Sequence, residues 1–192
     1  MVITSRTRNA VTGNRPRVRI PLTPPKIRLN EVSMVHLEKI TYDNCEDIFD
    51  LDIKKNQYDF VADNVYSVAQ AYVTLVNGGH VFPFAIYNDD TLVGFIQLAY
   101  GTNADQDGVS VEKDNYEVWR FMIDKKYQGK GYGKEAMRLA LDFIKTFPCG
   151  KAKYCWVSYN EENAVAKNLY ASFGFKETGE VCDDELVAVL EL

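Results

Sequence analysis

A glycine-rich stretch, DKKYQGKGYGK, spans residues 124–134 and lies between two apolar segments of different periodicity. The preceding segment, YEVWRFMI, reads as a strand, and the following segment, EAMRLALDFIKTF, has apolar residues at helical spacing. A glycine turn that opens a helix presents consecutive backbone N–H groups at the positive end of the helix dipole. Glycine also lets the backbone approach a ligand closely. The stretch therefore predicts a phosphate-binding turn.

Two common phosphate-binding turns do not match this stretch. A Walker A loop requires GxxxxGK followed by Ser or Thr, but Gly129 and Gly133 are one position too close, and Glu135 stands in place of the magnesium-binding hydroxyl. A dinucleotide fingerprint requires GxGxxG and an acidic residue near the end of the next strand. The spacing here is GxGxG, and the next strand ends in Ser158 and Tyr159. Neither kind of nucleotide site is predicted.

A third pattern, Gln/Arg-x-x-Gly-x-Gly/Ala, is met by Gln128, Gly131 and Gly133. It resembles the pyrophosphate loop of the GNAT superfamily, the acetyl-CoA-dependent N-acyltransferases. A second stretch, NAVAKNLYASFGF, begins at Asn163 and is similar to the superfamily signature N-x-x-A-x-x-L-Y-x-x-x-G-F at every specified position. Taken alone, the first stretch could be a glycine turn without a ligand, and the second could be a helix with an ordinary core tyrosine. Both stretches in this order favour the resemblance, which covers about residues 34–192.

The resemblance implies a site for acetyl-CoA as co-substrate. In this superfamily the strand before the glycine turn and the next parallel strand splay apart, and the pantetheine arm lies between them. By position, the backbone of Phe121 and Ile123 would contact the acetyl carbonyl and the pantetheine, and Asn163 the pantetheine or phosphate region. The pyrophosphate would be held by Gln128, Gly129, Lys130, Gly131, Tyr132, Gly133 and Lys134.

Acyl transfer from a thioester to an amine requires a neutral amine, a base, donors for the developing oxyanion and an acid for the leaving thiolate. No Ser–His or Cys–His arrangement is evident, which favours direct attack over an acyl-enzyme. By the resemblance, Tyr170 is the candidate acid, and a phenol pKa of about 10 is close to the value of about 8.5 for a thiol. Glu117 matches the position of the glutamate base in histone-acetylating members; the alternative is an exposed strand carboxylate. Arg120 is expected to be paired structurally.

Residues 50–73 and 119–137 look like those of bacterial spermine/spermidine (diamine) N-acetyltransferases. A polyamine site needs carboxylates spaced to meet several ammonium groups and an aromatic wall for the methylenes. The candidates are Asp59, Asp63 and Glu117 with Tyr58, Phe60 and Tyr66, and also Asp105 and Asp107 in a polar loop. The alternative for these acids is a solvated surface.

Two other functions remain open from the sequence. One is an N-acetyltransferase for a protein N-terminus or another small amine, such as an aminoglycoside or an amino acid. The other is a non-catalytic, regulatory acetyl-CoA-binding module whose basic N-terminal segment contacts nucleic acid. The presence of both a candidate acid and a candidate base favours an enzyme.

The elements that must position these residues are predicted to form one α/β domain over residues 34–192. Strands are expected at 35–40, 81–87, 91–100, 116–123 and 153–159, with a terminal pair after residue 174. Helices are expected from an Asp43–Glu46 capping box and at 65–79, 131–147 and 161–173. Together with the resemblance, this order predicts a GNAT-like mixed, mostly antiparallel sheet of about seven strands. Its central parallel pair is splayed, and helices cover both faces.

Residues 1–33 differ in composition from the rest. They hold seven Lys or Arg residues against Glu31 alone, and they show no sustained periodicity, which predicts a flexible basic arm, most simply a leader ahead of a start at Met34. The whole chain has a net charge of −5, so the remainder is strongly acidic. An acidic body disfavours nucleic acid and favours a cationic partner.

The cysteine and histidine content limits the kinds of metal site that the protein could contain. Four cysteines without a CxxC pair and only two histidines disfavour a zinc site, so no metal is expected. No apolar run reaches the ~20 residues that a membrane span needs. The expectation is a cytoplasmic protein with reduced cysteines, whose partners are acetyl-CoA and a small-molecule amine. A homodimer remains open.

Overall fold

The computed structural model describes residues 34–101 and 108–192. The predicted arm, residues 1–33, and the loop acids Asp105 and Asp107 lie outside the described residues. The described chain forms a seven-stranded sheet in the order β1-β2-β3-β4-β5-β7-β6. Neighbouring strands are antiparallel except β4 and β5, which are parallel. The predicted mixed sheet is confirmed.

The elements follow the predicted order. The strands are β1 Val35–Lys39, β2 His80–Asn88, β3 Thr91–Tyr100, β4 Tyr116–Ile123, β5 Tyr154–Tyr159, β6 Lys176–Cys182 and β7 Glu185–Glu191. The helices are α1 Cys45–Phe49, a 3₁₀ turn η1 Lys55–Gln57, α2 Asn64–Val76, α3 Tyr132–Ile144 and α4 Ala164–Ser172. None of the helices in the described ranges is long and apolar enough to cross a membrane.

The capping box predicted for the first helix is wrong. Helix α1 begins one residue later, after Asn44, and no side chain caps it. The Asn44 amide serves the preceding turn instead, because its Oδ1 accepts from Thr41 N at 2.8 Å and its Nδ2 donates to Lys39 O at 3.1 Å. This short helix is held by burial of Ile48, which is fully inaccessible.

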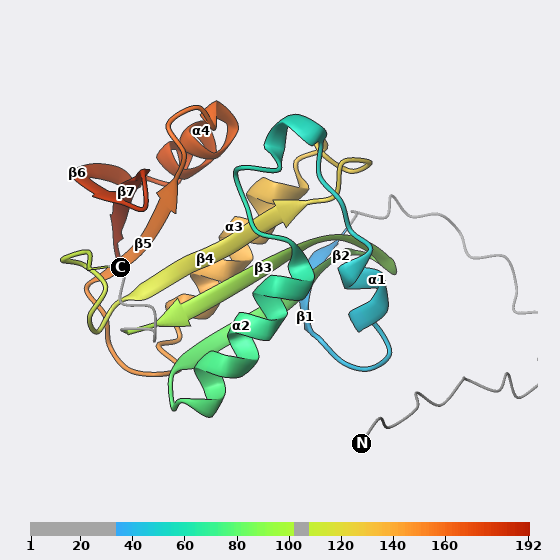
Figure 1. Cartoon of the computed structure of the whole chain (residues 1–192), viewed down its shortest axis with the longest axis horizontal. Helices are drawn as coiled ribbons and strands as arrows, with labels where there is room; N and C mark the ends of the chain where they lie inside the picture. Colours follow the sequence, from blue (N-terminus) through green and yellow to red (C-terminus); the bar gives the residue numbers. More distant parts are fainter. Residues whose placement is uncertain (1–33, 102–107) are drawn as a thin grey trace, which may run out of the picture. The chain divides into compact units, whose positions relative to one another are not determined.

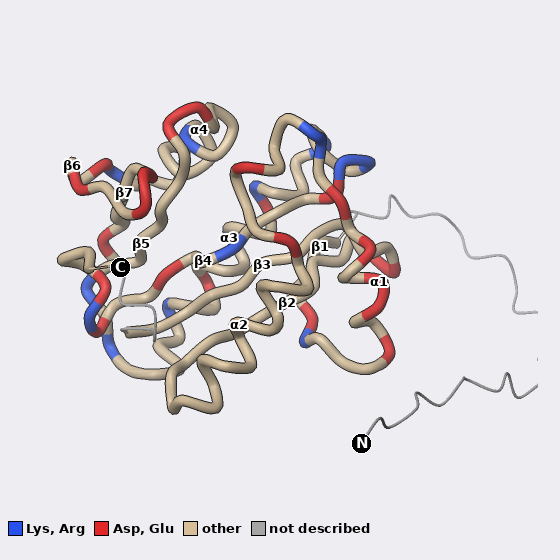
Figure 2. The backbone as a smooth tube through the Cα atoms, in the orientation of Figure 1, with Lys and Arg blue, Asp and Glu red and all other residues tan. Residues whose placement is uncertain are grey.

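Helix α2 ends where its glycines predict. Gly79 N donates to Thr74 O at 2.9 Å and Gly78 N donates to Leu75 O at 3.1 Å, the hydrogen-bond pair of a Schellman motif. Gly78 has a φ of 80°, the left-handed conformation that this motif requires. No charged residue occurs along α2, as its tan trace in Figure 2 shows.

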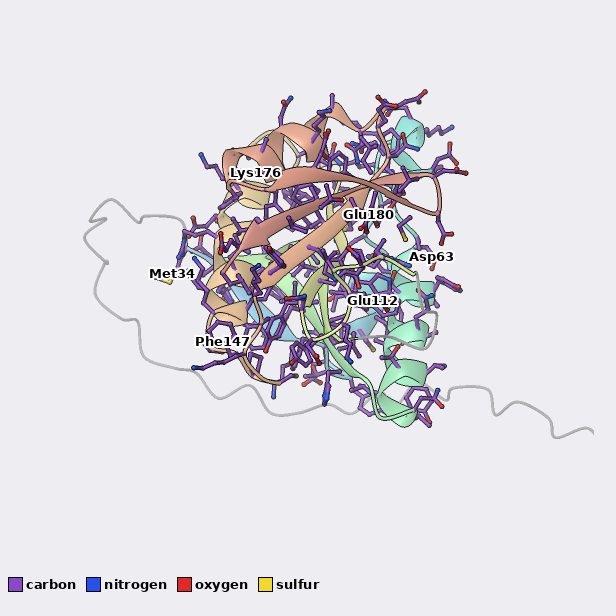
Figure 3. All side chains as sticks on the ribbon, turned by 90° about the vertical axis from the view of Figure 1, so that its left-hand side faces the viewer. Met34, Asp63, Glu112, Phe147, Lys176 and Glu180 are labelled. Carbon is purple, nitrogen blue, oxygen red and sulfur yellow. The ribbon has the colours of Figure 1, made fainter. Side chains whose placement is uncertain are left out.

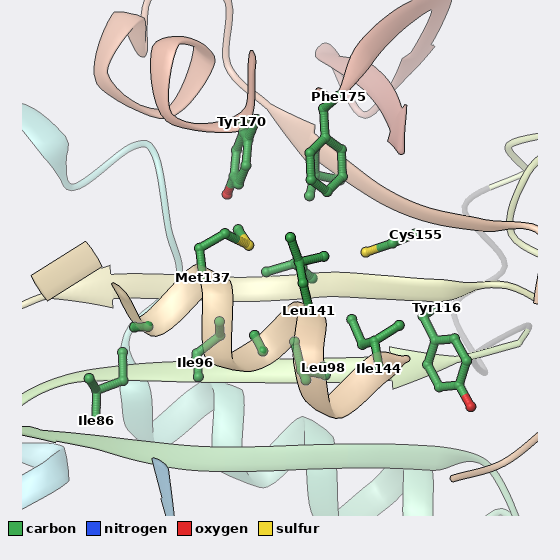
Figure 4. Close-up of a cluster of buried hydrophobic side chains, with 14 of the residues drawn as sticks. Ile86, Ile96, Leu98, Tyr116, Met137, Leu141, Ile144, Cys155, Tyr170 and Phe175 are labelled. Atoms are coloured by element: carbon green, nitrogen blue, oxygen red, sulfur yellow. The ribbon is translucent and has the colours of Figure 1, made fainter. Parts of the chain in front are cut away.

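Helices cover both faces of the sheet, as predicted. Figure 1 shows α2 in front of the strands and α3 behind them, and Figure 3 shows the same layers from the side. One buried cluster joins the sheet to α3 and α4 through residues such as Met137, Leu141 and Tyr170 (Figure 4). A second cluster on the opposite face contains Ile48 of α1 and Phe95 of β3. Helices α3 and α4 therefore share a face.

The parallel pair separates soon after it begins. Strand β4 pairs with β5 only at Tyr116–Cys155 and Glu117–Trp156. On its other side, the register with β3 shifts so that Trp119 is passed over, which is a β-bulge. Beyond Glu117, β5 supplies no register partner for β4. This is the splayed pair that the sequence resemblance implied.

Candidate active site

A cavity of about 980 Å³ lies where β4 and β5 separate. Its walls come from β4, the glycine turn, the start of α4, the end of β5, the segment before α2 and the β6–β7 turn. The cavity thus reaches from the predicted cofactor residues to the predicted acceptor residues. Among the described residues, no group of His, Cys, Asp or Glu could hold a metal ion.

The glycine turn has the backbone that an anion cradle requires. Gly129 and Gly131 have φ values of 78° and 87°, and a Cβ added at either would meet no atom within 4 Å. The first bond into α3 runs from Glu135 N to Gly131 O at 3.2 Å. Within the described chain, the N–H groups of residues 129–134 have no protein acceptor. Unsatisfied donors at a helix start are suited to a phosphate.

The predicted cofactor residues divide into two groups. Phe121, Ile123, Gln128, Gly129, Gly131, Gly133, Lys134 and Asn163 line the cavity. Lys130 and Tyr132 do not line it, and Lys130 Nζ lies 5.3 Å from the centre of the Tyr127 ring. A Cβ at Gly133 would lie 3.5 Å from Ile123 Cγ1, so the start of α3 packs closely on β4.

Two predicted cofactor residues have hydrogen-bond partners within the protein. Gln128 Nε2 donates to Gln57 Oε1 at 2.8 Å and to Ile123 O at 3.0 Å. Asn163 caps α4, because its Oδ1 accepts from Ala166 N at 3.1 Å. The Nε2 of Gln128 is therefore engaged with protein, and its backbone N–H donates to Asp124 O at 3.2 Å.

Tyr170, the predicted acid, is only 7% exposed. Its ring packs against Tyr159 and Phe175, each with a ring-centre distance of 5.6 Å. Figure 4 shows its hydroxyl on the side of β4. Burial, followed by the nearby Cys155, Glu185 and Tyr159, raises the pKa of Tyr170. The phenol is consequently protonated at neutral pH.

Glu117, the predicted base, is 4% exposed and lines the same cavity. The exposed-carboxylate alternative is therefore wrong. Glu117 pairs with Trp156 across the parallel strands, at the last register position before β4 and β5 separate. Burial, with Glu117 as the second cause, raises the pKa of the Cys155 thiol. Glu117 and Tyr170 thus both lie within electrostatic reach of Cys155.

The predicted acceptor residues are only partly brought together. Asp59, Tyr58, Phe60 and Tyr66 line the cavity. Asp63 does not line it; its Oδ1 accepts from Tyr66 N at 2.8 Å and caps α2 (Figure 3). A carboxylate one residue before a helix satisfies an otherwise unpaired N–H group. That position explains Asp63 without a ligand.

Several lining residues were not predicted from the sequence. The β6–β7 hairpin contributes Cys182, Asp183 and Glu185, and Glu185 accepts a 2.5 Å hydrogen bond from Ser158 Oγ of β5. Figure 2 shows acidic residues on this hairpin. Asp183 and Asp184 have φ values of 45° and 67°, as a two-residue turn of type I′ requires. The Asp-Asp pair between two strands was the only sequence signal for this turn.

Arg120 also lines the cavity, but its partners are neutral. Its Nη2 donates to Gln70 Oε1 at 3.1 Å and its Nη1 to Trp119 O at 2.8 Å. Its Nε is buried without a partner, and no carboxylate of the described chain pairs with the guanidinium. The predicted structural pairing is thus made with an amide, which leaves a positive charge in the cavity wall.

Residues 45–175 match the family model described as the acetyltransferase (GNAT) family. The match covers more than half of the sequence, and the chain belongs to this family. It is 32% identical over 162 residues to a probable spermine N(1)-acetyltransferase of Bacillus subtilis subsp. natto, with 82% of this chain and 99% of that protein covered. It is 31% identical over 162 residues, with the same coverage, to the spermine/spermidine N(1)-acetyltransferase of Bacillus subtilis strain 168.

Solved structures share the fold at lower identity. A spermidine N-acetyltransferase from Vibrio cholerae, in complex with CoA and spermine, superposes with a TM-score of 0.59 at 17% identity, covering 82% of this chain and 94% of that one. The aminoglycoside acetyltransferase AAC(6')-Ib, in complex with coenzyme A, superposes with a TM-score of 0.66 at 15% identity, covering 82% of this chain and 95% of that one. These likenesses establish the fold and do not select an acceptor.

Proposed function

We propose that this chain transfers the acetyl group of acetyl-CoA to a primary amine of a polyamine such as spermidine or spermine. The observation that carries the proposal is the single cavity that joins the glycine turn to a wall of carboxylates and aromatic rings. The names of the two relatives above 30% identity support the same acceptor. Four acidic side chains in that lining can meet a polycation: Asp59, Glu117, Asp183 and Glu185.

The cofactor half is assigned to the glycine turn and β4. The open N–H groups of residues 129–134 hold the pyrophosphate, and Lys134 adds a positive charge in the lining. The β4 backbone at Phe121 and Ile123 borders the splay, where β5 provides no register partner, and is assigned to the acetyl carbonyl and the pantetheine. Backbone donors aimed at a developing oxyanion are a large source of rate acceleration.

Each of the two proton transfers in the reaction is assigned to one residue. Glu117 accepts a proton from the amine as the new N–C bond forms, and Tyr170 gives a proton to the sulfur as the C–S bond breaks. Burial raises the pKa of Tyr170, so it holds this proton at neutral pH.

A second acceptor class is favoured by Arg120. A cation in the cavity wall that has no carboxylate partner among the described residues suits an acceptor that carries its own carboxylate, such as an amino acid or a peptide. A polyamine has no such group. The polyamine assignment rests on the acidic lining and the relatives, whereas the carboxylate-bearing acceptor rests on Arg120 alone.

A thiol-release assay across polyamines, peptides, aminoglycosides and amino acids tests the assignment. Spermine and spermidine are expected to give the highest kcat/KM. If the enzyme instead prefers an amino acid or a peptide, and Arg120→Gln loses that preference, the proposed acceptor is a carboxylate-bearing amine and not a polyamine. Binding of acetyl-CoA without thiol release on any amine would instead indicate a non-catalytic module.

A further inference from the structure

Residues 52–60 include Tyr58, Asp59 and Phe60, which form the acceptor wall of the cavity. Polar contacts join this segment to the stretch that contains the glycine turn. Asp52 N donates to Asp124 Oδ2 at 3.0 Å, and Lys125 N donates to Asp52 O at 2.8 Å. Lys125 also forms an ion pair with Asp52. Asp124 lies directly after β4 and is 2% exposed, so this end of the segment is anchored firmly.

The other end of the segment is held to the glycine turn through one side-chain amide oxygen, Gln57 Oε1. Gln57 Oε1 accepts from Gln128 Nε2 at 2.8 Å and from Lys54 N at 3.1 Å. Gln128 Nε2 in turn donates to Ile123 O at 3.0 Å. Gln57 is thus the direct link between η1 and the glycine turn that follows Gln128.

Gln57 itself lines the cavity, and the acceptor wall continues directly after it. Tyr58, Asp59 and Phe60 line the cavity, and Phe60 N donates to Gln57 O at 2.9 Å. The η1 turn has no buried residue. A segment with little apolar burial is held by its polar contacts and opens at low free energy. Its position is therefore sensitive to the Gln57–Gln128 bond.

We propose that Gln57 is a positioning residue that couples the two substrate sites, so that acetyl-CoA binding at the glycine turn orders residues 54–60 for the acceptor. This rests on the proposed function. A ligand on the backbone of residues 129–134 restrains the turn, Gln128 and its bond to Gln57. The acceptor then loses less conformational freedom when it binds, which is a positive coupling between the two sites. A coupling of this kind typically changes affinity on the order of tenfold.

The bond geometry supplies matched variants. Gln57 acts in both side-chain bonds only as an acceptor, so Gln57→Glu retains the bonds and Gln57→Leu removes them. Asn56 is exposed in the same turn and makes no side-chain hydrogen bond within the described chain, so Asn56→Leu controls for a leucine in η1. None of these substitutions alters a residue assigned to the cofactor or to the chemistry.

Amide hydrogen exchange with and without coenzyme A tests the coupling without an acceptor. Coenzyme A is expected to slow exchange in residues 54–60 as well as 128–134 for the wild type, Gln57→Glu and Asn56→Leu. In Gln57→Leu the slowing should remain at 128–134 and disappear at 54–60. Slowing confined to 128–134 in the wild type, or slowing at 54–60 that persists in Gln57→Leu, overturns the coupling. Absence of any slowing at 128–134 would contradict the proposed function and the coupling together.

Steady-state kinetics with spermine as acceptor separate coupling from general damage. Gln57→Leu is expected to raise the KM for spermine on the order of tenfold, with the Kd for coenzyme A unchanged in the absence of acceptor. Gln57→Glu is expected to restore the wild-type KM. A fall in kcat with an unchanged KM for spermine, or failure of Gln57→Glu to restore it, would assign Gln57 a structural role only.

Discussion

Tyr170 shows at the scale of one residue how burial keeps a phenol protonated. Desolvation raises the pKa of Tyr170 above the usual value of about 10, so the phenol keeps its proton through the range in which enzymes work. Glu185, held by Ser158, and Cys155 reinforce the shift. A phenol in this setting keeps its proton, as the proposed role as general acid requires.

The first prediction concerns Tyr170→Phe, which keeps the ring packing and removes the proton donor. The value of kcat is expected to fall by about 10²–10⁴, the usual effect of losing a general acid, with little change in the Kd for acetyl-CoA. In the wild type, the alkaline loss of kcat should begin above pH ~10, because the pKa is raised. Tyr159→Phe is the matched control, because the Tyr159 hydroxyl is bonded to Glu177. Near-normal kcat in Tyr170→Phe would reject the role.

The second prediction separates backbone strain from ligand exclusion at Gly131. Its φ of 87° strains any L residue by about 1–2 kcal/mol, and an added Cβ would point into open space. Gly131→Ala is expected to weaken acetyl-CoA binding modestly, whereas Gly131→Glu is expected to abolish it, because the carboxylate repels the pyrophosphate. Calorimetric titration measures both, with thermal melting to verify the fold. Wild-type affinity for acetyl-CoA in both variants would exclude the turn as the phosphate site.

At the scale of the structural element, two acidic residues four positions apart, Asp59 and Asp63, have different roles. Asp63 belongs to helix α2 as its N-cap, whereas Asp59 belongs to the cavity wall. This distinction depends on where the helix begins: Asp63 precedes the first residue of α2, so its carboxylate meets an N–H group of the first turn. Asp59 lies before that turn and faces the cavity.

The third prediction is that stability and acceptor affinity respond to different members of this pair. Asp63→Ala is expected to lower the free energy of unfolding by about 1 kcal/mol, the usual cost of a lost N-cap, without changing the KM for spermine. Asp59→Asn is expected to raise the KM for spermine and leave stability unchanged. Denaturant titration and initial rates measure the two effects. A raised KM for spermine in Asp63→Ala, with stability unchanged, would instead support a role for Asp63 in the acceptor site.

The whole molecule should lose stability at high pH because of its buried tyrosines. Burial and the hydrogen bond to Glu177 raise the pKa of Tyr159 to about 12, and burial raises the pKa of Tyr170 as well. An unfolded tyrosine ionises near pH 10. Between about pH 10 and 12 the unfolded chain therefore releases protons that the folded chain retains, and this favours unfolding.

The fourth prediction follows from that linkage. The free energy of unfolding should be insensitive to Tyr159 ionisation below about pH 9, and should fall as pH rises from about 10 to 12. In Tyr159→Phe the fall over this interval should be smaller, because one shifted group is absent. Urea titrations at fixed pH steps measure it. An identical decline in the wild type and in Tyr159→Phe would show that Tyr159 does not contribute.

The sequence by itself determined the features that depend on near neighbours. The glycine turn, the amphipathic helix α3 and the Gly78–Gly79 end of α2 follow from backbone preference and periodicity within a few residues. The order of elements and the family signatures were sufficient to predict the mixed sheet, and they made Tyr170 and Glu117 the candidate acid and base.

Only the tertiary structure decided which polar groups meet across the chain. The Gln57–Gln128 bond joins residues 71 positions apart, and the Ser158–Glu185 bond joins residues 27 apart. The same folding gave Arg120 an amide partner on α2 and gave Gln128 Nε2 two acceptors within the protein. A local pattern specifies the conformation of its own segment, whereas the partner of a polar side chain depends on how distant segments pack. The acceptor wall is therefore the part of the site that the sequence predicted least completely.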